Sequence, residues 1–81
     1  MKEMESKIIE ILKRYTFNAV VWETYTLNSK IIQDLKVNSA RIIDITLDIE
    51  EEFNIEVDDE KLENVITVKD LIDLVMQYTG K

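Results

Sequence analysis

The chain contains no cysteine, no histidine and no proline, and its only glycine is Gly80. Without cysteine it can form neither a disulfide nor a thiolate zinc site, and it has no cysteine nucleophile. Without histidine it lacks the usual general base near neutral pH. A glycine-rich phosphate-binding loop is excluded as well. We therefore expect neither a hydrolase nor a metalloenzyme, and we predict that the protein is not an enzyme.

Basic residues are also scarce, since 10 Lys and Arg stand against 17 Asp and Glu, for a net charge of −7. That charge disfavours nucleic acid, because phosphates require a basic surface, and it disfavours anionic membranes. The longest apolar run covers only residues 19–22, whereas a membrane span needs about 20 residues. The polar, acidic start MKEMESK does not resemble a signal peptide. We expect a cytoplasmic monomer whose partners are basic.

The acidic residues are concentrated in the second half of the chain. Residues 1–37 carry six basic and five acidic side chains, a net charge of +1, and residues 38–81 carry four and twelve, a net charge of −8. Most of the excess falls between Asp44 and Glu63. Such a run is either a solvated surface or a docking surface that steers basic partners.

Three segments have the apolar spacing of amphipathic helices, at residues 2–14, 39–53 and 68–78. A short helical turn is expected at residues 58–63, where an aspartate can cap it. Thr67 followed by Asp70 predicts a capping box, and Gly80 suits the end of the last helix. The 81 residues suit one domain. The predicted fold class is all-α: a single four-helix bundle over residues 1–81, with three long helices, one short helix and a long first loop.

The connection from Tyr15 to Asn38 is long for a small domain. It is rich in apolar residues, so we expect an ordered loop that packs across the bundle, with a helical turn near residues 28–33. Trp22 is expected to anchor the loop in the core. Several β-branched residues would permit a strand, but a lone strand has no partner.

Two acidic clusters are candidates for chemistry. Asp44, Asp48 and Glu51 share one helical face, as a carboxylate-pair hydrolase would require, but such spacing is common in acidic helices. The acids at residues 58–63 lack the alternating acids and central glycine of a calcium loop. We predict no catalytic residue and no metal site.

Asn38 and Ser39 stand where the long connection enters the acidic second helix. Either residue can be its N-cap. The same position offers free backbone amides and a partial positive charge, which suit a phosphate ester on the serine oxygen. The residues alone leave both interpretations open.

Residues 34–75 read DLKVNSARIIDITLDIEEEFNIEVDDEKLENVITVKDLIDLV. This segment resembles the acyl carrier proteins, in which a D-L-G-x-D-S-L run precedes a helix ending in E-E-E-F, followed by I-x-I/V-x-D-E and T-V-x-D-L. The resemblance implies a four-helix bundle with 4′-phosphopantetheine attached covalently to Ser39, beside Asn38. It implies a carrier of acyl thioesters for fatty-acid, polyketide or related specialised biosynthesis, within lipid metabolism.

The resemblance also implies partners: a phosphopantetheinyl transferase and acyl-transferring or condensing enzymes with basic docking surfaces. On the second helix the acids and exposed aliphatic residues would form the docking surface, an apolar centre in a charged rim. The predicted docking residues are Arg41, Ile43, Asp44, Leu47, Glu50 and Glu51. The alternative for Ile43 and Leu47 is burial under the long first loop. Six core residues are also candidates for the wall of an acyl-chain site: Ile42, Ile45, Ile49, Phe53, Leu71 and Val75.

The sequence departs from the family pattern at three positions. Asn38 replaces an aspartate that helps the transferase bind magnesium–coenzyme A, Ala40 replaces a leucine, and Lys36 replaces a glycine. Ala40 and Arg41 change the surface beside the arm, which favours a specialised carrier with its own partners. Two alternatives stay open: an unmodified interaction module of the same fold, and a carrier of an aminoacyl unit in a dedicated pathway.

Overall fold

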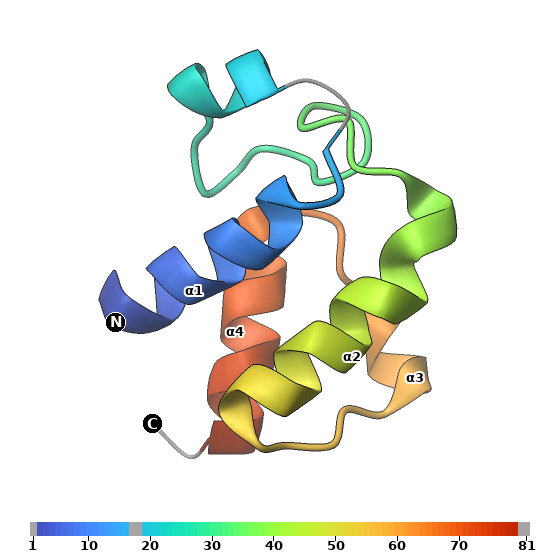
Figure 1. Ribbon diagram of the computed structural model, residues 1–81. Coiled ribbons are helices and arrows are strands. Elements are labelled where there is room, and N and C mark those ends of the chain that lie inside the picture. The colour runs from blue at the N-terminus through green and yellow to red at the C-terminus, as the bar shows by residue number, and fades with distance from the viewer. Residues whose placement is uncertain (1, 17–18, 80–81) are drawn as a thin grey trace.

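The structure, a computed structural model, describes residues 2–16 and 19–79. Its three long helices are α1 (Lys2–Lys13), α2 (Ile42–Phe53) and α4 (Val68–Thr79), and its short helix is α3 (Asp59–Leu62) (Figure 1). Two 3₁₀ turns, η1 (Ala19–Thr24) and η2 (Ser39–Arg41), complete the helical elements. The all-α architecture with a long first loop is therefore confirmed.

The long helices meet through their apolar stripes. Ile8, Ile11 and Leu12 of α1 are almost completely buried, because their spacing places them on one face. They share a single core with α2, α4 and the loop, and full burial of each side chain of this size contributes roughly 1.5–3 kcal/mol. The partners from the other elements are Trp22, Ile31, Leu35, Val37, Ile45, Ile49, Val68, Leu71, Ile72 and Val75.

The long first loop is ordered, as predicted, and covers one end of the bundle (Figure 1). Trp22 is 6% exposed, and its Nε1 donates to Thr16 Oγ1 at 3.0 Å, so this residue does anchor the loop. The helical segment lies at η1, earlier than the predicted residues 28–33. Residues 31–35 form a turn instead, in which the Asp34 and Leu35 amides donate to the Lys30 carbonyl.

Two isolated β-bridges, Thr16 with Val37 and Lys30 with Thr67, tie the loop to its surroundings. Among the β-branched residues of the loop, Thr16 and Val37 pair with each other in a single bridge, whereas Val20, Val21 and Thr24 lie in η1. In the described ranges no longer strand forms.

The second helix begins differently from the prediction. Residues 39–53 form two parts, the 3₁₀ turn η2 and the α-helix α2, rather than one α-helix. The Arg41 amide donates to the Asn38 carbonyl at 2.9 Å, a three-residue spacing that tightens this turn. The α-helix itself begins at Ile42, directly after the turn. Its C-cap residue is Asn54, whose left-handed backbone (φ 55°) directs its amide to the Glu50 carbonyl.

The predicted capping box at the start of α4 is confirmed. The Asp70 amide donates to Thr67 Oγ1 at 3.1 Å, and Asp70 Oδ2 accepts from the amides of Thr67 (3.1 Å) and Ile66 (3.0 Å). These amides, Thr67 first, hold the pKa of Asp70 below its ordinary value of 3.8. Gly80, the expected end of this helix, lies outside the described residues.

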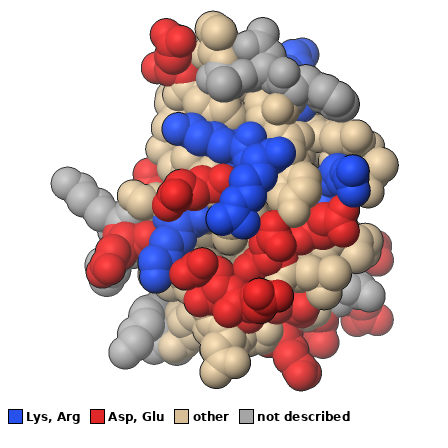
Figure 2. Space-filling model, in the orientation of Figure 1, with Lys and Arg blue, Asp and Glu red and all other residues tan. Residues whose placement is uncertain are grey.

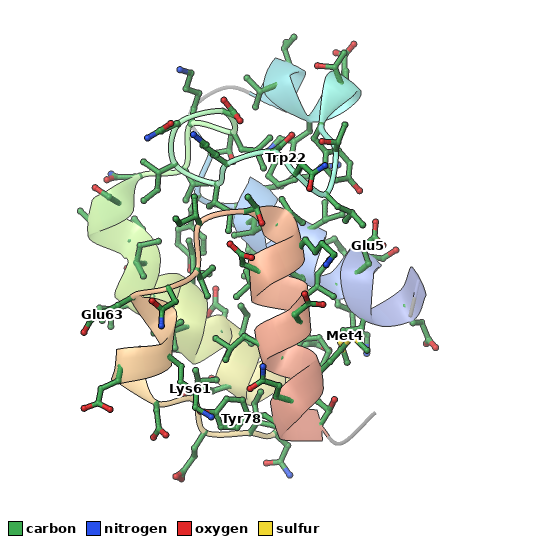
Figure 3. The ribbon with its side chains drawn as sticks, turned by 180° about the vertical axis from the view of Figure 1, so that it is seen from behind. Met4, Glu5, Trp22, Lys61, Glu63 and Tyr78 are labelled. Carbon is green, nitrogen blue, oxygen red and sulfur yellow. The ribbon has the colours of Figure 1, made fainter. Side chains whose placement is uncertain are left out.

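The short helix α3 lies within the predicted turn, but its cap differs. Asp58 is the N-cap residue without a capping bond from its side chain. Its backbone amide donates instead to the Tyr78 hydroxyl at 3.0 Å, and Lys61 Nζ lies 5.1 Å from the centre of the Tyr78 ring (Figure 3). Tyr78 therefore links α3 to the end of α4 and is only half-buried.

Two expectations concern what the fold does not contain. Across residues 2–16 and 19–79, no helix combines the length and apolar character needed to cross a lipid bilayer. In the same part of the chain, no three acidic residues gather in a group able to hold a metal ion.

Candidate functional site

Asn38 is the cap of the helix that follows it. Its backbone is extended (φ −69°, ψ 117°), and its Oδ1 accepts from the Ala40 amide at 2.9 Å. The Asn38 amide donates to the Tyr15 carbonyl at 3.3 Å, which ties the cap to the end of α1. Of the two residues that the sequence offered as caps, the structure uses the asparagine.

The side chain of Ser39 consequently does not cap the helix. It is exposed and is the first residue of η2, which continues directly into α2. Among the described residues no hydrogen bond involves the Ser39 hydroxyl. An exposed hydroxyl at the positive start of a helix is sterically open to an enzyme and electrostatically suited to a phosphate ester.

Ser29 has a different environment. Its side chain is half-buried in the loop, and its Oγ accepts from the Thr26 amide at 2.9 Å. Its carbonyl accepts from the Val68 amide at 3.1 Å, next to the capping box of α4. Ser29 is therefore a structural residue of the turn that holds the loop against α4.

The two exposed aliphatic residues of α2, Ile43 and Leu47, lie four positions apart on one side of the helix. Their exposed fractions are 61% and 54%, so the long loop does not cover them. Asp44 lies between them in sequence and forms an ion pair with Arg41 at 2.8 Å. Exposed apolar residues beside charged ones are typical of an interaction surface.

The two glutamates predicted for docking differ in their contacts. Glu50 is half-buried, and its Oε2 accepts from the Val57 amide at 2.8 Å, which fixes the connection between α2 and α3. Glu51 is exposed. A change at Glu50 therefore affects the fold as well as the surface, whereas a change at Glu51 affects mainly the surface.

Other acids of α2 are paired with α1. Glu52 lies 3.3 Å from Lys7, and Asp48 lies 3.6 Å from Arg14 and accepts from the Tyr15 hydroxyl at 2.6 Å. This hydrogen bond is the main cause of the raised pKa of Tyr15, followed by burial. Figure 2 shows the resulting mixture of basic and acidic side chains on the face formed by α1 and α2. The acidity of the chain is thus partly neutralised on this face.

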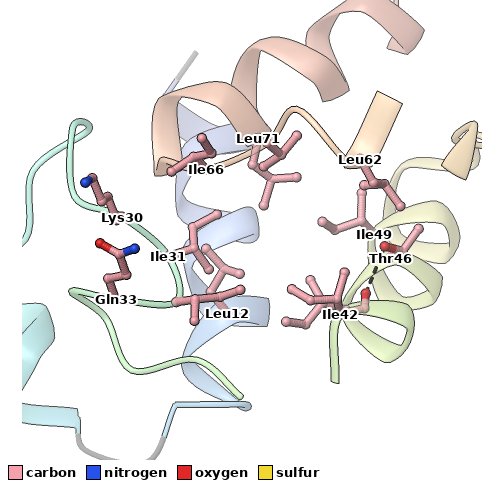
Figure 4. A pocket seen from close by; sticks show the side chains of 13 residues that line it. Leu12, Lys30, Ile31, Gln33, Ile42, Thr46, Ile49, Leu62, Ile66 and Leu71 are labelled. Carbon is pink, nitrogen blue, oxygen red and sulfur yellow. Dashed lines mark hydrogen bonds between the residues drawn. The ribbon is translucent and has the colours of Figure 1, made fainter. Parts of the chain in front are cut away.

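A cavity of about 300 Å³ lies between α2, the loop and the segment from α3 to α4 (Figure 4). One of its lining residues is Ile42, three residues after Ser39 in the sequence. Of the six core residues predicted as a possible wall, Ile42, Ile45, Ile49 and Leu71 line it, whereas Phe53 and Val75 do not. The remaining lining residues are Leu12, Lys30, Ile31, Ile32, Gln33, Thr46, Leu62, Val65 and Ile66.

Thr46 and the loop residues of this wall are not among the residues predicted from the sequence. Thr46 stands at the margin of the apolar stripe of α2, which is the available signal for its position. The contribution of residues 30–33 depends on how the loop folds back, because the Ile31 amide donates to the Ile66 carbonyl at 2.9 Å.

Residues 25–75, 51 of the 81, match the model of the family described as phosphopantetheine attachment site. The chain belongs to this family. Phosphopantetheine-binding domains are non-catalytic carriers, and they hold 4′-phosphopantetheine covalently on a serine. A search of curated proteins found no match. The matched range contains two serines, Ser29 and Ser39.

The residues of this phosphopantetheine-binding domain fit the prosthetic group. The attachment needs a hydroxyl that a transferase can reach, and Ser39 is exposed at the start of a helix. The group supplies a thiol on a flexible arm, which a chain without cysteine does not itself possess.

Proposed function

We propose that the protein is an acyl carrier protein whose 4′-phosphopantetheine is attached to Ser39. The observation that supports Ser39 is its contrast with Ser29, the other serine in the matched range. Ser29 is half-buried and hydrogen-bonded to the Thr26 amide, whereas Ser39 is exposed and its neighbour Asn38 supplies the cap. Attachment at Ser39 leaves the hydrogen bonds of the helix start intact.

In the attachment reaction, the Ser39 oxygen forms a bond to the phosphorus of coenzyme A that carries pantetheine. The phosphoanhydride bond breaks, 3′,5′-ADP leaves, and the serine proton passes to a base of the transferase. The product is a negatively charged phosphodiester at a helix start, where the backbone dipoles favour it. Asn38 contributes by holding the Ala40 amide, so the turn that presents Ser39 is fixed.

The carrier function needs a place for the acyl group between enzymes. The cavity beside Ile42 has a mostly apolar wall, and an acyl chain inside it would be removed from water. Ile42, Ile45 and Ile49 are then both core residues and contacts of the cargo. The cargo belongs to fatty-acid, polyketide or related specialised biosynthesis, and the carrier is a cytoplasmic monomer formed by one domain over residues 1–81.

The docking surface of this carrier is the exposed side of η2 and α2. Ile43 and Leu47 form its apolar centre, and Arg41, Asp44, Glu50 and Glu51 form its charged rim. The partners are a phosphopantetheinyl transferase and acyl-transferring or condensing enzymes with basic surfaces. Electrostatic attraction of this kind increases the association rate and weakens as salt rises.

The attachment is tested by incubating the purified apo protein with coenzyme A, Mg²⁺ and phosphopantetheinyl transferases, including those of the source organism. Intact mass spectrometry then measures the addition of one phosphopantetheine. We expect addition to the unmodified sequence and to Ser29→Ala, and none to Ser39→Ala. No addition with any transferase would instead support an unmodified interaction module of the same fold.

The docking surface is tested with a pair of neighbouring substitutions. Glu51→Lys should slow modification. It should leave the free energy of unfolding unchanged, because Glu51 is exposed. Glu50→Lys should slow modification and also destabilise the fold, because it removes the acceptor of the Val57 amide, a loss of about 1 kcal/mol. Transferase kinetics and urea denaturation separate the two effects. Unchanged kinetics for Glu51→Lys at low salt would contradict this docking surface.

A further inference from the structure

Three polar residues line the cavity, and one of them, Thr46, is buried and has no part in the proposed function. Thr46 is 8% exposed and is the buried polar residue of the described part of the chain. It lies on α2 between Ile42 and Ile49, which line the same cavity (Figure 4). The cavity therefore has an oxygen in an otherwise aliphatic stretch of wall.

The hydrogen bond of Thr46 determines what this oxygen can offer. Its Oγ1 donates to the Ile42 carbonyl at 2.9 Å, the dashed line in Figure 4. A hydroxyl has one hydrogen and two lone pairs, so its single hydrogen is already used. While this hydrogen bond is kept, Thr46 offers a molecule in the cavity only an acceptor.

This restriction separates the possible cargoes by their chemistry. A hydrocarbon chain fills the cavity without using the acceptor. A hydroxyl that donates to Thr46 recovers a hydrogen bond that it loses on leaving water, whereas a carbonyl finds no donor there. A protonated amine is disfavoured because burial of a charge without a counter-charge costs far more than burial of a hydroxyl.

The other polar residues of the wall do not have this role. Lys30 and Gln33 belong to the loop and are exposed, so water competes for their polar groups. Figure 4 shows both side chains at the loop side of the cavity, away from Thr46. Thr46 is the polar lining residue that is also removed from solvent.

We propose that Thr46 lets the cavity hold an acyl chain that carries a hydroxyl group, which donates to Thr46 Oγ1, as readily as an unsubstituted chain. This inference rests on the proposed function, because it takes the cavity as the site of the carried chain. The volume of about 300 Å³ lies at the lower end of the range of about 300–1,000 Å³ for small-molecule pockets. It suits a single substituted chain better than a polycyclic product.

The test bypasses the transferase, so that its failure is distinct from a failure of the attachment at Ser39. Ser39→Cys gives the chain its only cysteine. Its thiolate displaces bromide from bromoacetyl-linked pantetheine arms, forming a thioether. The arms carry equally long acyl chains with a ¹³C-labelled terminal methyl group, either unsubstituted or with one hydroxyl at successive positions. The methyl chemical shift reports the populations of the chain inside and outside the cavity.

We expect that, with the hydroxyl at one of the tested positions, the hydroxylated chain occupies the cavity at least as often as the plain chain. In Thr46→Val, which has nearly the same shape, the preference for the hydroxylated chain over the plain chain should fall at least about fivefold. Thr46→Ser should keep the preference and Thr46→Ala should lose it, and this second pair serves if valine perturbs the fold. An unchanged preference in the variants without the hydroxyl, or the absence of both chains from the cavity, would overturn the inference.

Discussion

The starts of α2 and α4 differ in how side chains satisfy the backbone amides that have no partner within the helix. At α4, Thr67 and Asp70 cap each other's amides, so both side chains are engaged in the structure. At η2 and α2, Asn38 alone provides the side-chain cap, and the next residue, Ser39, has an exposed hydroxyl. The first arrangement is suited to stability, and the second leaves a nucleophile accessible at a place that favours phosphate.

This contrast predicts that stability and modification separate between the two sites. Substitutions at the start of α4 should lower the free energy of unfolding and leave the transferase reaction intact. Substitutions at the start of η2 should impair modification, most strongly at Ser39, where the free energy of unfolding should hardly change.

The largest loss is expected for Asp70→Ala. This change leaves the amides of Ile66 and Thr67 without their acceptor and breaks the reciprocal cap, a loss of about 1–2 kcal/mol. Urea denaturation measures the loss, and intact mass after reaction with the transferase should still show full modification. Loss of modification in a folded Asp70→Ala protein would show that the two helix starts are coupled.

Asn38→Ala should cost about 1 kcal/mol, because it removes the side-chain acceptor of the Ala40 amide. Since the turn that presents Ser39 is then less well fixed, modification should also become slower. Asn38→Asp keeps an acceptor and is the matched control: it should remain as stable as the starting protein. Equal stability of Asn38→Ala and Asn38→Asp would contradict the capping role.

The pH dependence of stability should show the engagement of Asp70. Its pKa is lower in the folded protein than the ordinary value of 3.8, because the amides of Thr67 and Ile66 stabilise the carboxylate. Its contribution is therefore fully present above that value and is lost as the pH falls through the folded pKa. Denaturation midpoints from pH 6 to pH 2 should fall less steeply in Asp70→Asn than in the unmodified sequence. An equal fall of the denaturation midpoint with pH in the two proteins would show that Asp70 is not the cause of this pH dependence.

Ser39→Ala should have the smallest effect on stability, within about 0.5 kcal/mol, as is usual for an exposed position. Ser29→Ala should cost more, since Ser29 Oγ accepts from the Thr26 amide. Thermal denaturation of the two apo variants compares them directly. A larger loss for Ser39→Ala would show that the Ser39 hydroxyl has a structural role after all.

The features that the sequence predicts well depend on neighbouring residues. The stripes of α1 and α4 and the Thr67–Asp70 box follow from spacings of three or four residues, and the structure has them where predicted. The choice between Asn38 and Ser39 as cap was open because both residue types are suitable. It is decided by backbone geometry, including the 3₁₀ turn that the apolar pattern does not encode.

Contacts between distant residues were the least predictable. The bond from the Val57 amide to Glu50 and the pairing of Asp48 with Arg14 and Tyr15 depend on how the helices meet. They divide the acids of α2 into structural and exposed residues, which composition alone cannot do. Thr46 is a similar case, because its role follows from the cavity that the loop closes.

The central claim is that Ser39 carries the prosthetic group, and the most direct measurement locates it on the protein isolated from cells of its source. The chain has three serines, Ser6, Ser29 and Ser39. Proteolysis followed by tandem mass spectrometry assigns the added mass to one residue. The account predicts phosphopantetheine on the peptide that contains Ser39, bound through that serine. Phosphopantetheine on Ser29 or Ser6, or a Ser39 peptide that is always unmodified, would contradict it.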